Sequence, residues 1–357
     1  MPPSVAHAPA AATAGHGSAA LPSVVVDGYN SQLRDEDGFI GDKARRAAFF
    51  NALDGWRERA REAGDDPFDE AEIGDVTKKA IDKTLVEGDP AAQALVMSAI
   101  EDYAQQLAGV IRRLLRSKEW RDTQAIVVGG GLRAARFAEV ALARTELLLR
   151  AADIAIELRP IRHEPDQAGL IGAAHLAPRW MFAGHDSILS VDIGGTNMRA
   201  GLVELKLKES DDLAAAKVHA MELWRHGAED PKREDAVGRL VDMLKGLIRR
   251  AEKDNLKLAP FIGIGCPGEI APDGAIRTGA QNLPGNWESS RFNLPAILSA
   301  ALPPIDGNEV AILLHNDAVV QGLSQAPFMR DVDRWGVLTI GTGLGNARFT
   351  NKAGRDS

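Results

Sequence analysis

The chain has 357 residues, of which 45% are hydrophobic and 26% charged, a globular composition that can supply two domains with sizeable cores. A formal net charge of −8 argues against nucleic-acid binding through a basic surface, and the single cysteine, Cys266, excludes an intrachain disulfide. No uncharged apolar stretch is long enough to span a membrane, and the first basic residue is Arg34, too late for a secretory signal. We therefore expect a cytoplasmic protein without a nucleic-acid or membrane partner.

The first half of the chain predicts a tail, a helical region and a glycine-rich turn. Residues 1–20 are mainly Ala, Pro, Ser, Gly and His, which predicts a disordered tail. A short strand over 21–26 and long helices within 42–63 and 91–116 follow. A second strand, 125–131, ends in Gly129, Gly130 and Gly131. These glycines could let a flat base or ribose approach the bare backbone, or could simply pack a helix against a strand.

The stretch 187–204 is the most informative. An apolar run ends in Gly194-Gly195-Thr196-Asn197, and a second strand-like run begins at Ala200, which predicts a β-hairpin. Two glycines can turn their N–H groups toward one point and form a nest for phosphate oxygens, to which Thr196 adds a hydroxyl donor. Asp192, at the end of the first strand, suits a hydrated magnesium ion. An ordinary Gly-Gly hairpin remains the alternative.

A second strand–turn–strand unit lies near the C-terminus. The run 335–340 leads into Gly341-Thr342-Gly343-Leu344-Gly345, and 346–350 continues as a strand. No Gly-Lys-Ser/Thr follows either loop, and neither loop opens a helix, so the Walker and Rossmann patterns do not apply. Two such units predict two related half-domains that offer phosphate loops to one cleft.

Two further segments carry candidate chemistry. The loop around Asn282 and Glu288 is rich in amides, which both donate and accept hydrogen bonds and therefore suit hydroxyl-bearing ligands. A strand over 311–314 runs through Asn316 and Asp317 into a helix. Asp317 can be a simple helix cap or a functional carboxylate at the helix N-terminus, and spacing alone leaves the two open.

Together these motifs resemble the ROK family of repressors and sugar kinases, within the actin-like ATPases. The resemblance rests on DIGGTNMRAG, IGIGCPGEI, QNLPGNW, HND and GTGLG between residues 187 and 350, with a further match at 125–177. It implies an α/β, two-lobed actin-like ATPase (ribonuclease H-like) fold and ATP- and Mg²⁺-dependent phosphorylation of a sugar hydroxyl, with a hexose as the expected substrate.

The resemblance also implies roles for individual residues. Asp317 matches the general base, and Asp192 would support Mg²⁺ through water. Substrate contacts fall on Asn282, Asn316, Asp317 and Glu288. ATP contacts fall on the three glycine-rich turns, at Gly194, Gly195, Thr196, Asn197, Gly341, Thr342, Gly343, Gly129, Gly130 and Gly131.

The order of the motifs is altered relative to the family and resembles a circular permutation. Residues 21–178 would form the larger part of the second, nucleotide-side lobe. Residues 187–334 would form the first lobe with the sugar site, and 335–357 would return as the opening hairpin of the second lobe. This arrangement predicts that residues 349–351 lie in the same sheet as residues 24–26.

The chain departs from the family at the zinc site. No Glu-x-Gly-His segment follows the second loop, and one cysteine cannot build a cysteine-rich zinc site, so we expect no zinc. The C1 and C2 side of a sugar would need other ligands, for which His226, Glu269 and Glu288 are candidates. A non-catalytic sugar-sensing regulator and a different actin-like ATPase remain alternatives. A regulator would need a DNA-binding helix, and residues 40–116 lack a basic recognition helix. The family also leaves a homodimer open.

Overall fold

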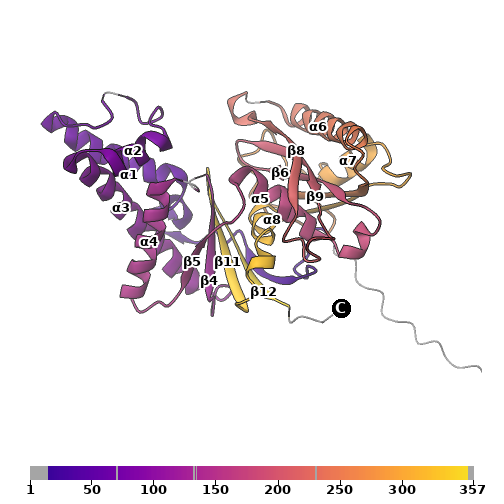
Figure 1. The fold of residues 1–357 in the computed structure, drawn as a ribbon, viewed down its shortest axis with the longest axis horizontal. Coiled ribbons are helices and arrows are strands. Elements are labelled where there is room, and N and C mark those ends of the chain that lie inside the picture. Colours follow the sequence, from indigo (N-terminus) through magenta and orange to yellow (C-terminus); the bar gives the residue numbers. More distant parts are fainter. Residues whose placement is uncertain (1–14, 70, 132, 134, 230, 353–357) are drawn as a thin grey trace, which may run out of the picture.

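The computed structural model describes residues 15–69, 71–131, 133, 135–229 and 231–352. Within these residues the chain builds two five-stranded sheets, which lie in the two halves of the molecule seen in Figure 1. The first sheet has the order β1 (Val24–Tyr29), β12 (Leu344–Asn351), β11 (Arg334–Ile340), β4 (Ala125–Gly130) and β5 (Glu157–Pro160). The second has the order β10 (Ala311–Asn316), β9 (Leu258–Cys266), β6 (Ser187–Ile193), β7 (Met198–Glu204) and β8 (Lys217–Trp224).

The half that holds the first sheet carries a helical layer beside it (Figure 1). This layer contains α1 (Arg46–Ala63), α2 (Lys78–Glu87), α3 (Pro90–Leu115) and α4 (Arg136–Ala151). The longest of them, α3, begins where Asp89 accepts a hydrogen bond from the N–H of Ala92 and Pro90 occupies the first helical position. Its apolar face packs against α1 and α4, with Phe49, Leu53, Ile100 and Phe137 fully buried.

In the other half, α6 (Arg233–Lys253) and α7 (Leu294–Ala301) accompany the second sheet. Short elements complete the chain: β2 (Arg34–Asp35), β3 (Gly38–Phe39) and five 3₁₀ turns among the described residues, at Ile40–Lys43, Ala173–Leu176, Arg179–Phe182, His226–Ala228 and Ala326–Phe328.

Two short helices, α5 (Pro165–Gly172) and α8 (Asp317–Leu323), lie against each other between the sheets. Their backbones approach so closely that a Cβ on Gly172 would lie 1.7 Å from the carbonyl oxygen of Val320. Likewise, a Cβ on Gly322 of α8 would lie only 2.7 Å from the ring of Phe349 on β12. Only glycine permits these approaches, and they fix α8, which starts at Asp317, between the two sheets.

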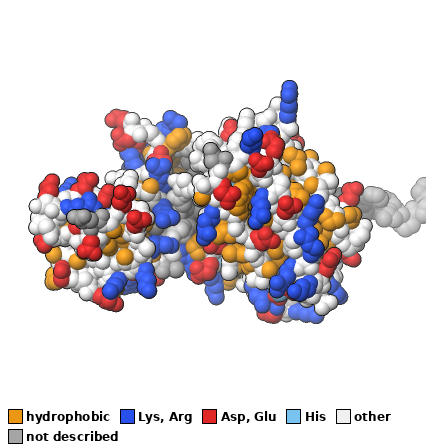
Figure 2. Space-filling view, turned by 90° about the horizontal axis from the view of Figure 1, so that it is seen from above, with side chains coloured by type: hydrophobic (Ala, Val, Ile, Leu, Met, Phe, Trp, Pro, Cys, Tyr) orange, Lys and Arg blue, Asp and Glu red, His pale blue; other side chains and the backbone are white. Residues whose placement is uncertain are grey.

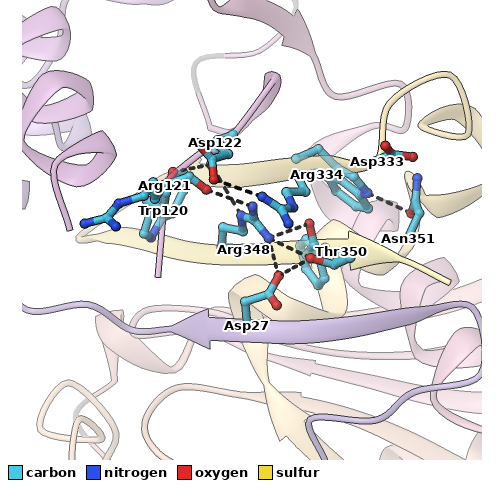
Figure 3. Close-up of polar contacts among 12 residues, drawn as sticks. Asp27, Trp120, Arg121, Asp122, Asp333, Arg334, Arg348, Thr350 and Asn351 are labelled. Atoms are coloured by element: carbon cyan, nitrogen blue, oxygen red, sulfur yellow. Dashed lines mark hydrogen bonds and ion pairs between the residues drawn. The ribbon is translucent and has the colours of Figure 1, made fainter. Parts of the chain in front are cut away.

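The two ends of the described chain meet in the first sheet. Strand β1 pairs antiparallel with β12, with Val24 opposite Asn351 and Val26 opposite Phe349, so the prediction that residues 24–26 and 349–351 lie in the same sheet is confirmed. Figure 3 shows the polar contacts at this junction. The guanidinium of Arg348, which is 3% exposed, donates to the Asp27 carboxylate, to Thr350 Oγ1 at 2.8 Å and to the Arg121 carbonyl at 3.1 Å.

The expectation of a disordered tail through residue 20 differs from the structure. Residues 1–14 lie outside the described residues, but residues 16–18 contact the outer edge of β10, and Ala19 and Ala20 pair with β1. The N–H of Gly17 donates to the Leu314 carbonyl at 2.9 Å, and His16 Nδ1 accepts from the N–H of Leu314 at 3.1 Å. An edge strand has unpaired backbone groups, and this segment pairs with them despite its small side chains. Separately, none of the helices in the described part of the chain is long and apolar enough to cross a membrane.

Candidate active site

A cleft of about 1670 Å³ opens between the two sheets. Seen from above, the molecule is hollowed between its halves, and Lys and Arg side chains stand on the walls of the hollow (Figure 2). The turns after β6 and after β11 both line this cleft, as do Gly130 and Gly131 at the end of β4. The structure therefore brings together the three glycine-rich turns that the sequence singled out, although they are up to about two hundred residues apart in the chain.

The turn between β6 and β7 is closed by the N–H of Gly194, which donates to the Asn197 carbonyl at 2.8 Å. His226 supports it from behind, with Nε2 lying 2.9 Å from the Gly194 carbonyl, and the N–H of Gly227 donates to the Thr196 carbonyl at 3.0 Å. Gly194, Gly195, Thr196 and Asn197 all line the cleft, as expected. His226 is 2% exposed, so the structure gives it a support role for this turn and not the ligand contact considered from the sequence.

The turn between β11 and β12 has a matching closure. The N–H of Gly341 donates to the Gly343 carbonyl at 2.9 Å, and the Gly341 carbonyl accepts from the N–H of Arg46 at the start of α1. Gly341, Thr342 and Gly343 line the cleft, as expected. Gly345 is needed for packing, because a Cβ there would lie 2.2 Å from Thr339 Oγ1.

The three glycines at the end of β4 show both of the roles that the sequence left open, packing and lining of the cleft. Gly129 is not among the cleft-lining residues, and a Cβ there would lie 3.0 Å from the Ile161 side chain, so its role is packing. Gly130 has a φ of +103° and would bring a Cβ within 2.2 Å of the Ile340 carbonyl. Gly130 and Gly131 both form part of the cleft wall, and the Gly131 carbonyl accepts a hydrogen bond from Lys78 Nζ at 2.6 Å.

Asp317 lies at the floor of the cleft, where β10 passes into α8. Asn316 caps this helix: its Oδ1 accepts from the N–H groups of Ala318 and Val319, and its Nδ2 donates to the Gly268 carbonyl at 3.1 Å. Asn316 is only 3% exposed, so most of its hydrogen-bonding capacity serves the protein. The carboxylate of Asp317 accepts from the N–H of Ala318 at 2.9 Å.

Burial and the negative charge of Asp192 raise the pKa of Asp317 from 3.8 to about 7. A carboxyl group of this pKa exchanges its proton near neutral pH, which suits a general base better than an ordinary aspartate does. The cap reading of Asp317 does not account for this, because Asn316 already caps the helix.

Asp192 does not reach the cleft surface. It is 2% exposed, its Oδ2 accepts from Arg199 Nη1 at 3.1 Å, and a Cβ on Gly169 would lie 2.5 Å from its carboxyl carbon. Burial raises its pKa in spite of Arg199, and its Oδ1 has no hydrogen-bond partner among the described residues. The expectation that Asp192 supports magnesium through water therefore requires Arg199 or the surrounding backbone to move, although the orphan oxygen leaves one acceptor free.

Arg199 and Asp166 are cleft residues that the sequence reasoning missed. Arg199 Nε donates to Asp166 Oδ1 at 2.8 Å, and both residues line the cleft beside Asp317. The predicted hairpin could have identified Arg199, because a turn between residues 193 and 198 places Arg199 directly opposite Asp192 on the neighbouring strand. Asp166 comes from α5, whose position against this hairpin has no signature in the local sequence.

The amide loop after β9 enters the cleft only in part. Gln281 and Asn282 line it, with Asn282 packed beside Gly195. Glu288 does not line the cleft; its Oε1 accepts from the N–H of Ala280 at 2.8 Å and closes the base of the loop. The position of Glu288 in this structure therefore does not support the substrate contact predicted for it. Trp287 is buried and donates to the Pro284 carbonyl, as a structural anchor does.

Within the described part of the chain, no group of three or more His, Cys, Asp and Glu gathers as a metal site. Magnesium in a nucleotide complex needs no such group, since phosphate oxygens and water supply most of its ligands and one or two carboxylates the rest. Asp317 and Asp166 are carboxyl groups of the cleft lining that fit this requirement, and the orphan oxygen of Asp192 lies buried behind them.

Comparisons with known proteins agree with part of this description. No family model matches the chain. A curated glucokinase from Thermotoga maritima is 30% identical over 166 residues, which are 46% of this chain and 44% of that protein. The chain thus spans less than half the length of the relative it matches. A solved chain from Cytophaga hutchinsonii, described as a "putative sugar kinase", matches 46% of this chain and 48% of its own at 20% identity and a TM-score of 0.32, too low to establish a shared fold.

Proposed function

We propose that this protein is an ATP-dependent sugar kinase that transfers the γ-phosphoryl group of ATP to a hydroxyl of a hexose, with Asp317 as the general base. The observation that carries the proposal is the position of Asp317, a carboxyl group with a pKa of about 7 on the floor of a cleft that three glycine-rich turns line. Similarity of part of the chain to a glucokinase supports the same reaction class.

In the proposed mechanism the protein's main tasks are positioning and charge stabilisation, as in other phosphoryl transfers. The N–H groups of the turns 194–197 and 341–343, apart from those of Gly194 and Gly341 that close the turns, receive phosphate oxygens from the two sides of the cleft. Asn282 and Asn316 hold hydroxyls of the sugar beside Asp317. Asp317 orients the reacting hydroxyl and accepts its proton as the hydroxyl oxygen attacks the phosphoryl group.

Magnesium, when bound with ATP, neutralises charge that develops on the transferred phosphoryl group. Asp317 and Asp166 would hold the hydrated ion, and the free Oδ1 of Asp192 would offer a further acceptor if Arg199 moved away from it. The side chain of Arg199 is 13% exposed, lines the cleft and pairs with Asp166 and Asp192, so an anion would compete with these two carboxylates for its guanidinium.

We further propose that the chain is a circularly permuted ROK-type kinase with a two-lobed actin-like fold. Residues 21–178 together with 335–352 would then form the nucleotide-side lobe, and 187–334 the sugar-side lobe. The pairing of β1 with β12 supports this assignment, because it joins the two chain ends inside one sheet. Closure of the lobes would exclude water from the reaction.

The test is ADP release with Mg-ATP across a panel of hexoses, amino sugars, uronic acids and polyols. The wild type is compared with Asp317→Asn and with Asp122→Asn, a surface control at the pair with Arg334 far from the cleft. We expect turnover of at least one sugar by the wild type and the control, and a loss of at least about 100-fold in Asp317→Asn. Sugar binding without any turnover would favour the sensing regulator and refute the kinase.

A further inference from the structure

The imidazole of His315 is buried at the end of β10, directly before Asn316 and Asp317, and it takes no part in the proposed reaction. Its Nδ1 accepts a hydrogen bond from the backbone N–H of Asn316 at 2.8 Å, and its Nε2 lies 3.2 Å from the carbonyl oxygen of Ser18. A carbonyl oxygen can only accept, so Nε2 carries the proton and Nδ1 is free to accept. The two partners thus select the same neutral tautomer of the ring.

Strand β10 is the outer strand of its sheet, and residues 16–18 lie against its open edge. The carbonyl of Leu314 accepts from the N–H of Gly17 at 2.9 Å, and the N–H of Leu314 donates to His16 Nδ1 at 3.1 Å. Backbone groups along a strand point alternately to its two sides. The N–H of Asn316, two residues further on, therefore points to the same open edge, where it meets the imidazole ring instead of a neighbouring strand.

This N–H belongs to the turn that carries the proposed base. Asn316 Oδ1 accepts from the N–H groups of Ala318 and Val319 and starts α8, and its Nδ2 donates to the Gly268 carbonyl at 3.1 Å. The imidazole holds the backbone of Asn316 while the side chain of Asn316 forms the first turn of the helix. Asp317 is the next residue, so the direction of its carboxyl group depends on how the backbone of Asn316 is held.

The ring of His315 is itself enclosed by two segments that both rest on Ile270, in the loop after β9. The Tyr29 ring, on β1, packs edge-on against His315 at a centroid distance of 5.2 Å, and Tyr29 OH accepts from the N–H of Ile270 at 3.2 Å. Gly17 has a φ of +59°, and a Cβ there would lie 2.3 Å from the Ile270 carbonyl oxygen. The close approach of Gly17 to Ile270 fixes the place of Ser18, and with it the partner of His315.

Resting on the proposed kinase function, we propose that His315 is a positioning residue for Asp317, and that residues 16–18 support the active-site turn from outside the cleft through it. The path runs from the Ser18 carbonyl to the imidazole and from there to the N–H of Asn316. His315 does not line the cleft, so it acts on the geometry of the turn and not on the substrate. Small displacements of a reacting group lower the rate steeply, so loss of His315 should lower kcat more than it alters either KM.

Two substitutions separate the two hydrogen bonds of His315. His315→Asn places an amide oxygen where Nδ1 lies, so it keeps an acceptor for the N–H of Asn316 and loses the link to Ser18. His315→Gln places an amide nitrogen where Nε2 lies, so it keeps the donor for Ser18 and loses the acceptor for Asn316. The first is the conservative variant for the turn, and the second breaks the contact that the proposal requires.

A pair of glycine substitutions tests the outer segment without changing a residue of the cleft. Gly17→Ala drives a Cβ against the Ile270 carbonyl and displaces the segment that carries Ser18. Gly15→Ala is the matched control, because Gly15 is exposed and no described atom would lie within 4 Å of its Cβ. The double variant Gly17→Ala/His315→Gln shows whether both substitutions break the same path.

Steady-state kinetics use Mg-ATP and a sugar that the wild type phosphorylates. We expect His315→Gln to lower kcat at least about tenfold and to change the KM for ATP and for the sugar less than about threefold, as expected for one lost hydrogen bond at the turn. His315→Asn should lose less than His315→Gln. Gly17→Ala should also lower kcat, Gly15→Ala should not, and the losses in the double variant should be less than multiplicative. Hydrogen exchange of residues 315–319 should become faster in His315→Gln and in Gly17→Ala.

Three results would overturn the inference and leave the kinase intact: a His315→Gln variant with the kcat of the wild type, a loss confined to the KM values, or losses in Gly17→Ala and His315→Gln that multiply in the double variant. A wild type without turnover of any sugar would overturn the proposed function and this role of His315 together. Thermal unfolding of each variant sets an assay temperature at which all of them are folded, so that a displaced turn is distinguished from a lost fold.

Discussion

The ionisation of Asp317 gives a quantitative prediction for the pH dependence of turnover. Burial and the charge of Asp192 raise the pKa of Asp317 to about 7. A general base acts only as the carboxylate, so kcat/KM should follow the ionised fraction. With this pKa roughly a tenth of the carboxyl groups are ionised at pH 6 and roughly nine tenths at pH 8. We therefore expect kcat/KM to fall about tenfold between pH 8 and pH 6, and about tenfold more for each further unit.

The cause of the shift can be tested separately from its size. Asp192→Asn removes the negative charge that disfavours ionisation of Asp317 but leaves the burial in place, so the acidic limb should move to lower pH by about one unit. For this variant only the pH of the acidic limb is compared with the wild type, and not the absolute rate, because Asp192 belongs to the proposed magnesium site. Asp122→Asn serves as the control and should leave the limb in place.

The assay is ADP release between pH 5 and pH 9 at constant ionic strength and saturating magnesium. A limb near pH 4 to 5 in the wild type would refute the raised pKa. An unchanged limb in Asp192→Asn would refute the coupling between the two carboxyl groups, even if the wild-type limb lay at pH 7.

The remaining predictions concern stability. Because the pKa of Asp317 is raised on folding from 3.8 to about 7, ionisation of Asp317 costs no folding free energy below pH 4 and progressively more up to pH 7. Asp317→Asn should therefore be more stable than wild type by about 4 kcal/mol at pH 8 and by about 1.5 kcal/mol at pH 5. Equal gains in denaturant melts at both pH values would contradict this. Gly172→Ala should lose more than about 3 kcal/mol in thermal unfolding, because the new Cβ would meet the Val320 carbonyl, whereas Gly109→Ala on α3, with nothing within 4 Å, should be neutral or slightly stabilising. Arg348→Met should cost about 1–3 kcal/mol, because the buried guanidinium loses its hydrogen bonds to Asp27, Thr350 and the Arg121 carbonyl at the junction in Figure 3. The double variant with Asp27→Asn should recover part of this loss, and additive losses would argue against the pair.

Local patterns in the sequence were sufficient for the glycine turns and for part of the sheet topology. A hairpin with two glycines has few conformations, so the turns at 194–197 and 341–343 could be predicted together with their exposure to a ligand. The pairing of residues 24–26 with 349–351 was also accessible, because the order of the motifs demanded it.

The sequence-based expectations that differ from the structure concern residues whose positions depend on tertiary contacts. Glu288 and His226 are polar residues in loops near the cleft, but hydrogen bonds to the backbone of Ala280 and to the Gly194 carbonyl turn them toward the protein. The segment 15–20 has a composition typical of disorder, yet the open edge of β10 gives its backbone partners. Asn30 also lines the cleft, and its N–H donates to the Asn346 carbonyl, a contact between distant segments that no local sequence pattern predicts.

The measurement that tests the central claim most directly is phosphorus NMR of the products formed from Mg-ATP and a sugar that supports ADP release. The account predicts equal amounts of ADP and a new sugar phosphate for the wild type, and at least about 100-fold slower formation in Asp317→Asn, with ATP binding retained. Release of inorganic phosphate without a sugar phosphate, or an Asp317→Asn variant as active as the wild type, would contradict a sugar kinase that uses Asp317 as its base.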